Sequence, residues 1–346
     1  EGKALAAMAE MAEAGVVAFS DDGQPVWDAV LMRHAMEYGL MFGLPIIDHC
    51  QDPALTKGAT MHEGSVSTRL GVRGWPAAGE DIMVARNIEL SRLTGARVHI
   101  AHLSTAGGVE MVRRGKAEGL AVTAEVTPHH LTLTHERVLG CGHGLAGLTQ
   151  GEACGAPEPY DTLARVAPPL RTESDIEALI AGLNDGTIDC IATDHAPHAL
   201  EDKLCEFDQA ANGISCFETA FGSLMSLVHR GAIDLPLLIS KLTAGPAEIL
   251  LGTSNGGWGT KAGQTARPEP VEGRARGGRG GAGRSPLVPD GLGTLAVGAP
   301  ADVVLLDPEA EWTVDPERFL SKGKNSPLKG VRLKGRVAAT YVGGVR

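Results

Sequence analysis

The sequence has few aromatic residues, no closely spaced cysteine pair and no long apolar run. Aromatic residues make up 4% of the 346 residues, although 43% are hydrophobic, as in an ordinary globular protein. The six cysteines include no C-x-x-C pair, and no apolar run is long enough to cross a bilayer or form a signal peptide. These absences exclude a C-x-x-C metal or redox motif and a transmembrane segment, and they predict a cytoplasmic protein.

Positive charge is also scarce. Lysine and arginine number 31 against 42 acidic residues, which gives a formal net charge of −11 and a pI near 5.6. A nucleic acid or an anionic membrane needs a basic face, so neither is expected as the main partner. The composition instead favours a small-molecule ligand.

Runs typical of strands alternate with helical patterns along the chain. The strand-like runs are 16–19, 44–50, 97–103, 121–128 and 188–197. Helical patterns at 81–95 and 108–119 lie between them. This alternation predicts a parallel sheet, either open or closed into an eight-stranded barrel, with its chemistry at the carboxyl ends of the strands.

Four of the predicted strands end on a side chain able to bind metal. Asp22, His49, His102 and Asp194 each follow an apolar run directly. Imidazole and carboxylate are the ligands that catalytic zinc sites use, and these four meet only if the sheet closes.

Several motifs together resemble those of the bacterial dihydroorotases, within the amidohydrolase superfamily. They are AFSDDG, DHCQD, VSTRLG, HIAHLSTAGG, AEVTPHHL, APPLR, IATDHAPH and NSPLKG, in this order. The resemblance implies an incomplete (β/α)8 barrel of the TIM type over residues 1–251. It also implies part of a small β-sandwich at 293–346, with a low-complexity inserted loop at 252–292 between the two.

The resemblance also implies roles for single residues. Asp22, His49, His102 and Asp194 match ligands of one or two zinc ions, and Asp194 also matches the group that carries the proton. The implied reaction is reversible hydrolysis of dihydroorotate to N-carbamoyl-L-aspartate, in pyrimidine biosynthesis.

Three further positions match substrate contacts. His198 matches a residue that contacts the substrate carboxylate, on a loop that continues to Gly213. Ala167 stands where the family has a substrate-binding asparagine, so that one polar contact is absent or is made elsewhere. The paired histidines His129 and His130 match no known ligand, and we expect them to be structural or to support the ligands.

The family's first barrel strand ends in H-x-H followed by Arg, and no H-x-H occurs in this sequence, which begins at Glu1. We therefore expect that about three β/α units lie upstream of this chain. Without those two ligands the chain by itself is expected to hold zinc weakly and to be inactive.

Two alternatives stay open. A hydantoinase, dihydropyrimidinase or allantoinase would typically carry lysine at the position of Asp22. A non-catalytic subunit would instead scaffold aspartate transcarbamoylase, and a homodimer is a further possible assembly.

The composition of 252–292 generates a first prediction. This stretch is rich in Gly, Arg and Pro without periodicity, so it buries too little apolar surface to offset chain entropy. A variant that joins Leu251 to Gly293 through a short turn should keep its melting temperature within a few degrees, because loop closure entropy depends only logarithmically on length. A fall of about ten degrees in a calorimetric scan would contradict this.

Overall fold

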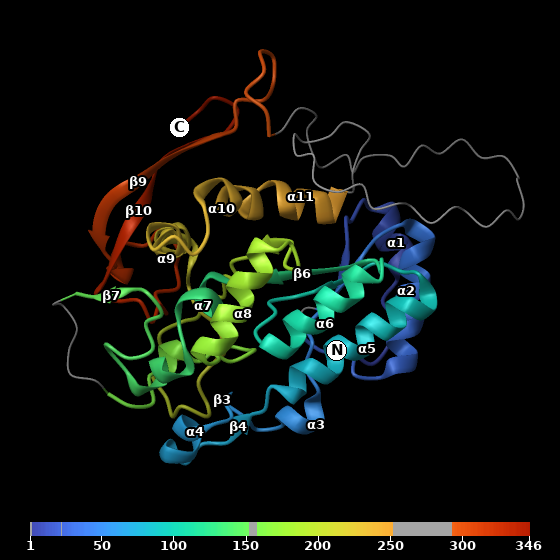
Figure 1. Ribbon diagram of the computed structural model, residues 1–346, viewed down its shortest axis with the longest axis horizontal. Coiled ribbons are helices and arrows are strands. Elements are labelled where there is room, and N and C mark those ends of the chain that lie inside the picture. Colours follow the sequence, from blue (N-terminus) through green and yellow to red (C-terminus); the bar gives the residue numbers. More distant parts are fainter. Residues whose placement is uncertain (1, 22, 152–157, 252–292) are drawn as a thin grey trace, which may run out of the picture.

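A computed structural model describes residues 2–21, 23–151, 158–251 and 293–346 (Figure 1). A five-stranded sheet has the order β1-β2-β5-β6-β8, and each strand pairs with its neighbours in parallel. Its strands are β1 (Phe19–Ser20), β2 (Ile46–Asp48), β5 (Val98–Ile100), β6 (Val122–Val126) and β8 (Cys190–Ile191). Each of the five predicted runs overlaps one of these strands, in sequence order, so the predicted parallel sheet is confirmed.

Long helices connect successive strands and line up beside one another on the near face in Figure 1. They are α2 (Ala29–Phe42), α5 (Ala78–Thr94), α6 (Ala106–Ala117) and α8 (Glu173–Asn184). The helices predicted at 81–95 and 108–119 correspond to α5 and α6. The predicted β/α alternation is therefore also confirmed.

The described chain contains further helices and short strands. These are α1 (Met8–Glu13), α3 (Pro53–Thr56), β3 (Met61–His62), α4 (Ser65–Leu70), β4 (Gly74–Trp75), α7 (Pro128–Thr132), α9 (Phe217–His229), α10 (Leu235–Leu242) and α11 (Ala244–Leu251), with 3-10 turns at His135–Leu139, Thr162–Ala164 and Pro316–Arg318.

Local side-chain chemistry begins and ends the connecting helices. The Thr105 hydroxyl accepts from the Gly108 amide at the start of α6. Thr172 and Asp175 form a reciprocal capping box at the start of α8. Gly95 ends α5 in the left-handed conformation, at φ 72°, which glycine adopts without steric cost. These local contacts fix where α6 and α8 begin and where α5 ends.

The core lies between the sheet and these helices. All three residues of β5 are buried, with Val98 1% and Ile100 0% exposed. A parallel strand is covered on both faces, so apolar residues normally fill it, each contributing about 1.5–3 kcal/mol by burial. His99 on β5 and Glu125 on β6 break that rule.

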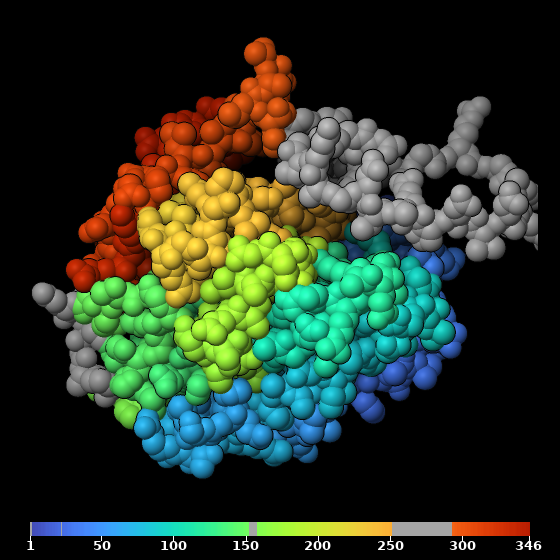
Figure 2. Space-filling view, viewed as in Figure 1, coloured from blue at the N-terminus to red at the C-terminus, as the bar shows by residue number. Residues whose placement is uncertain are grey.

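An antiparallel sheet of order β7-β10-β9 forms the curved ribbon at the upper left of Figure 1 and the red edge of Figure 2. It comprises β7 (Thr149–Gln150), β9 (Val303–Thr313) and β10 (Val331–Tyr341), and β10 packs against α9. Strands β9 and β10 fall in the predicted sandwich segment. The domain boundaries stay a prediction, because 252–292 lies outside the described residues.

The state of the cysteines and the hydrophobicity of the helices can be compared with what the sequence lacks, a C-x-x-C pair and a transmembrane run. Cys50, Cys190, Cys205 and Cys216 are free thiols, whereas Cys141 is disulfide-bonded. Over the described ranges, every helix is too short or too polar to cross a membrane.

A buried ion pair holds the loop residues Arg171 and Ser104 against Glu80 of α5 and Trp75 of β4. The Arg171 guanidinium, 2% exposed, lies 3.3 Å from the Glu80 carboxylate and donates to Ser104 Oγ at 3.0 Å and to the Trp75 carbonyl at 3.0 Å. The Ser104 amide donates to Glu80 at 2.7 Å. The carboxylate partner of Arg171 is therefore Glu80.

This pair generates a stability prediction. Arg171→Met should lower the free energy of unfolding by about 3–5 kcal/mol, because it leaves the buried Glu80 carboxyl without its cation. Burial already raises the pKa of Glu80, and Arg171 opposes that rise. Urea denaturation measures the loss. The matched control is Arg33→Met, which removes the exposed pair Arg33–Glu37 and should cost about 1 kcal/mol or less. Equal costs for the two variants would contradict the assignment.

Candidate active site

Two of the predicted metal ligands are in contact at the carboxyl ends of β2 and β5. His49 Nδ1 lies 2.7 Å from His102 Nε2. On its other side, His49 Nε2 faces Gln51 Oε1 at 2.9 Å, and Gln51 Nε2 donates to Thr56 Oγ1 at 2.8 Å. Because an amide oxygen only accepts, His49 carries its proton on Nε2 and turns the Nδ1 lone pair toward His102.

The two imidazoles suit a divalent metal. Burial and the neighbouring His49 hold the pKa of His102 well below its ordinary value, so its ring is neutral. Neutral imidazole is the form that ligates zinc, and two nitrogens at this spacing need a shared proton or a cation between them. The donor set present at this end of the sheet therefore fits the metal that the sequence predicted.

The backbone is unusual where these ligands leave their strands. His102 has φ 32° and Asp194 has φ 47°, both in the left-handed region that non-glycine residues rarely adopt. Such conformations persist where surrounding contacts impose them, and they gather at functional sites. At His102 one such contact is the Glu125 carboxylate, whose Oε1 accepts from the His102 amide at 3.3 Å.

Asp194 lies near these groups without completing a compact set. Burial, followed by the Glu125 charge, raises the pKa of Asp194, while His49 lowers it, so the carboxyl faces both residues. Among the described residues, one group of three possible metal ligands has all its ligand atoms within 4.8 Å of one another. Asp194 does not belong to that group.

The paired histidines differ from each other. His130 is satisfied, with Nδ1 2.8 Å from Thr127 Oγ1 and Nε2 3.1 Å from the Pro168 carbonyl. The ring nitrogens of His129 have no hydrogen-bond partner in the described part of the chain, and its Nε2 lies 4.0 Å from Asp194 Oδ2. His130 is thus a structural residue, whereas His129 adjoins the proposed proton carrier.

Asp22, the fourth predicted ligand, lies outside the described residues. Its neighbour Asp21 accepts from the His49 amide at 3.1 and 3.2 Å. Burial, together with the Asp21 charge, raises the pKa of Asp48 to about 7. Carboxylates therefore crowd the end of β2, and Arg86, whose Nη2 lies 3.3 Å from Asp48 Oδ2, offsets part of their charge.

The predicted substrate residues are arranged around one loop. His198 Nε2 lies 2.8 Å from the Asn212 carbonyl, and the His198 amide donates to Asn325 Oδ1 at 2.9 Å. Gly213 has φ 141°, and a Cβ there would lie 2.5 Å from Ala196 Cβ and 2.9 Å from His198 Nε2. Ala167 is partly buried, and its side chain offers no polar atom. Gly213 thus lets the loop close against His198.

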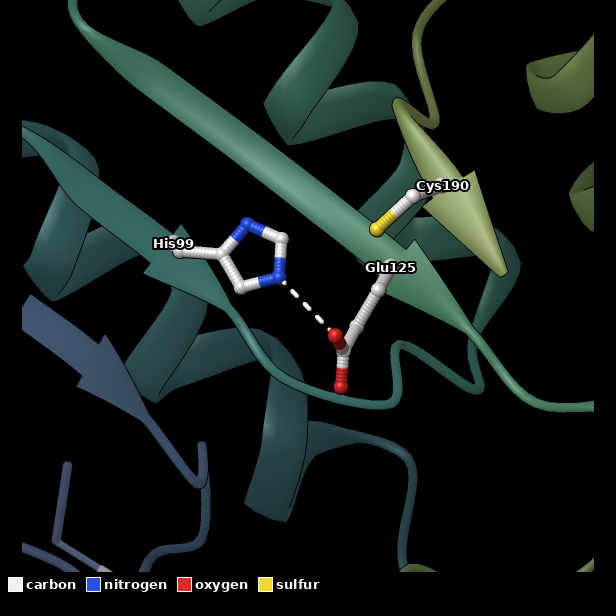
Figure 3. Close-up of side chains that lie close together, drawn as sticks. All are labelled: His99, Glu125 and Cys190. Carbon is white, nitrogen blue, oxygen red and sulfur yellow. Dashed lines mark hydrogen bonds and ion pairs between the residues drawn. The ribbon is translucent and has the colours of Figure 1, made fainter. Parts of the chain in front are cut away.

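Sequence reasoning missed a buried polar group inside the sheet. His99, Glu125 and Cys190 come from β5, β6 and β8, and their side chains point toward one another (Figure 3). The His99 Nε2 to Glu125 Oε2 distance is 3.1 Å. The available signal was a histidine in VHI and a glutamate in VTAEV, since polar residues are unexpected inside parallel strands.

Solved structures establish the class of fold. The chain is similar to the D-hydantoinase (dihydropyrimidinase) of a Thermus species, with TM-score 0.69 and 21% identity over 98% of this chain and 65% of that one. It is equally similar to the L-hydantoinase of Arthrobacter aurescens, with TM-score 0.70 and 22% identity over 98% of this chain and 66% of that one. The fold is therefore that of an amidohydrolase barrel, represented here in part, and this prediction is confirmed.

Sequence relatives establish the family. The dihydroorotase of Caldanaerobacter subterraneus subsp. tengcongensis is 43% identical over 99% of this chain and 67% of its own length. That of Pelotomaculum thermopropionicum is 45% identical over the same shares. A family model described as dihydro-orotase-like matches residues 1–107. The chain belongs to the dihydroorotase family of cyclic amide hydrolases, and it spans about two thirds of the length of these relatives.

The loop around His198 generates a third prediction. Gly213→Ala should destabilise the protein by at least about 2 kcal/mol, because the new Cβ overlaps Ala196 and His198 as well as straining the backbone. The control is Gly186→Ala, also at positive φ (81°) but facing open space, which should cost only about 1–2 kcal/mol. Urea denaturation compares the two, and a Gly213 variant no less stable than the control would refute the close approach.

Proposed function

We propose that this chain supplies metal ligands, the proton carrier and a substrate loop of a zinc-dependent dihydroorotase, which interconverts dihydroorotate and N-carbamoyl-L-aspartate. The observation that carries the proposal is the His49–His102 contact at 2.7 Å, at adjacent strand ends of a chain 43% identical to a dihydroorotase. His49, His102, Asp194 and the undescribed Asp22 are the proposed ligands of one or two zinc ions.

When bound, zinc supplies Lewis acidity that polarises the ring amide and acidifies water. The remaining work falls to side chains of this chain. Asp194 Oδ takes the proton that the attacking water loses and returns it to the leaving amide nitrogen. Its raised pKa suits both steps, because a carboxyl that titrates closer to neutrality holds a proton more readily and still releases it.

His198 is proposed to hold the substrate carboxylate. Its Nε2 already donates to the Asn212 carbonyl, since a carbonyl only accepts. A carboxylate would therefore be met by Nε2–H after the ring leaves Asn212, or on the Nδ1 side of the ring, where Asp202 Oδ2 lies 3.9 Å away and would have to move. Ala167 adds no side-chain hydrogen bond, so His198 carries more of the recognition here than in relatives with asparagine at that position.

Hydantoinase activity is the weaker alternative. The solved hydantoinases share the fold at 21–22% identity, whereas the curated dihydroorotases are about twice as similar in sequence. A cytoplasmic location accompanies the proposal: four of the five described cysteines are free thiols, while Cys141 is disulfide-bonded. No contact among the described residues favours a homodimer or a scaffold for aspartate transcarbamoylase. A chain extended by the upstream H-x-H strand should catalyse the reaction if the protein is an enzyme, and should not if it is only a scaffold.

A fourth prediction tests the proton carrier in a chain extended at its amino end by the upstream β/α units that the family resemblance implies, including the H-x-H strand. Asp194→Asn should keep the fold but lower kcat for dihydroorotate at least about a hundredfold, because the amide cannot accept the proton. The control is Asp208→Asn, which neutralises an exposed aspartate of the same loop region and should leave kcat unchanged. A kcat within a few-fold of the parent in Asp194→Asn would disprove the assigned role.

A fifth prediction tests substrate choice in the same extended chain. His198→Ala should raise KM for dihydroorotate about tenfold or more, through loss of a charge-assisted hydrogen bond, and should affect dihydrouracil little because it lacks the carboxylate. If the parent prefers dihydrouracil or hydantoin, and His198→Ala leaves that preference unchanged, the hydantoinase alternative holds instead.

A further inference from the structure

The side chains of His99, Glu125 and Cys190 form a group inside the sheet. The proposed hydrolysis gives no role to His99 or Cys190, and Glu125 enters it only through its contact with His102 and its charge near Asp194. His99 lies three residues before His102 on its strand, and Cys190 lies four residues before Asp194. We propose that His99, Glu125 and Cys190 form a second metal site, which takes Zn²⁺ or another thiophilic divalent cation. This site differs from the strand-end site in containing sulfur, and the proposal does not depend on the proposed reaction.

Strand register brings the three ligands together. Glu125 is paired directly with Cys190, and His99 is paired with Thr123, two residues before Glu125. Because alternate residues of a strand share a face, these side chains all project on the same side of the sheet. Their candidate ligand atoms lie within 4.8 Å of one another, as Figure 3 illustrates. One imidazole, one carboxylate and one thiol from three adjacent strands form a donor set suited to zinc.

The histidine is already oriented as a metal ligand would be. Thr123 Oγ1 lies 2.8 Å from His99 Nδ1, on the side of the ring away from the carboxylate. With the proton on Nδ1 and donated to this hydroxyl, Nε2 presents a lone pair to Glu125 Oε2 at 3.1 Å. Two acceptors facing each other need a proton or a cation between them. A metal-bound histidine usually donates its far N–H to a carboxylate, a backbone carbonyl or a water, and the Thr123 hydroxyl takes that place here.

Cys190 differs from the other described free thiols. Cys216 Sγ donates to the Thr193 carbonyl at 3.0 Å, Cys50 Sγ to Asp48 at 3.5 Å and Cys205 Sγ to the Asp202 carbonyl at 3.6 Å. Cys190 Sγ has no such partner in the described part of the chain, although the residue is only 2% exposed.

Burial, with Glu125 and Asp189 nearby, raises the pKa of the Cys190 thiol, so a thiolate forms there only with a cation. Metal binding would therefore displace the Cys190 proton.

Cobalt(II) tests the site, because a cysteine ligand adds an intense near-ultraviolet thiolate-to-cobalt charge-transfer band that histidine and carboxylate ligands do not produce. The metal-free chain, titrated with cobalt(II), should develop this band. Cys190→Ser should abolish it, while the matched variant Cys216→Ser, which alters another buried thiol, should retain it. His49→Asn, at the strand-end site, should lower the total cobalt bound but leave the band.

Thr123→Val keeps the size of that side chain but removes the hydroxyl, and it should weaken cobalt binding at this site about 10–100-fold. If Cys190→Ser does not fold, Thr123→Val and His99→Gln still test whether cobalt binds at this site. An absent band in the unmodified chain would overturn the proposal, as would a band that survives Cys190→Ser or is unaffected by both His99→Gln and Thr123→Val. In those cases His99 and Glu125 are a hydrogen-bonded pair alone.

Discussion

Parallel pairing of β2, β5 and β6 is the constraint on which the rest of the structure depends. Ile46, Ile47 and Asp48 pair in register with Val98, His99 and Ile100, and these pair in turn with 122–124. Parallel strands with helical crossovers end on the same edge of the sheet. His49 and His102, separated by 53 residues in sequence, are therefore delivered to one place, where their rings meet. The buried apolar core holds this register, because a one-residue slip would turn each strand's side chains to the other face.

Glu125 connects the strand ends with the interior of the sheet. One carboxylate oxygen accepts from the His102 amide and the other faces the His99 ring. The same charge raises the pKa of Asp194. A single carboxylate thus supports the backbone of one proposed ligand, adjusts the acidity of another and faces a possible second cation. Polar groups inside a parallel sheet are costly unless each has a partner, and these contacts supply the partners.

Fold and family rest on different kinds of similarity. The hydantoinases share the barrel at TM-scores near 0.7, yet only about a fifth of their residues are identical. That likeness reflects the layered packing of strands and helices, which many sequences satisfy. The dihydroorotases share more than two fifths of their residues with the chain. Specificity depends on single contacts, such as the one proposed for His198, so sequence similarity is the better guide to the substrate.

The sequence alone determined the order of strands and helices and the strand-end histidines, because apolar runs and the residues that stop them are local patterns. It also identified the family, through short motifs in a fixed order. Only the tertiary structure decided that Arg171 pairs with Glu80, that Gly213 closes against His198, and that Gln51 fixes the tautomer of His49. The grouping of His99, Glu125 and Cys190 also depended on tertiary structure. Each of these depends on strand register, loop closure or side-chain direction, which bring together residues whose spacing in the sequence carries no periodic signal.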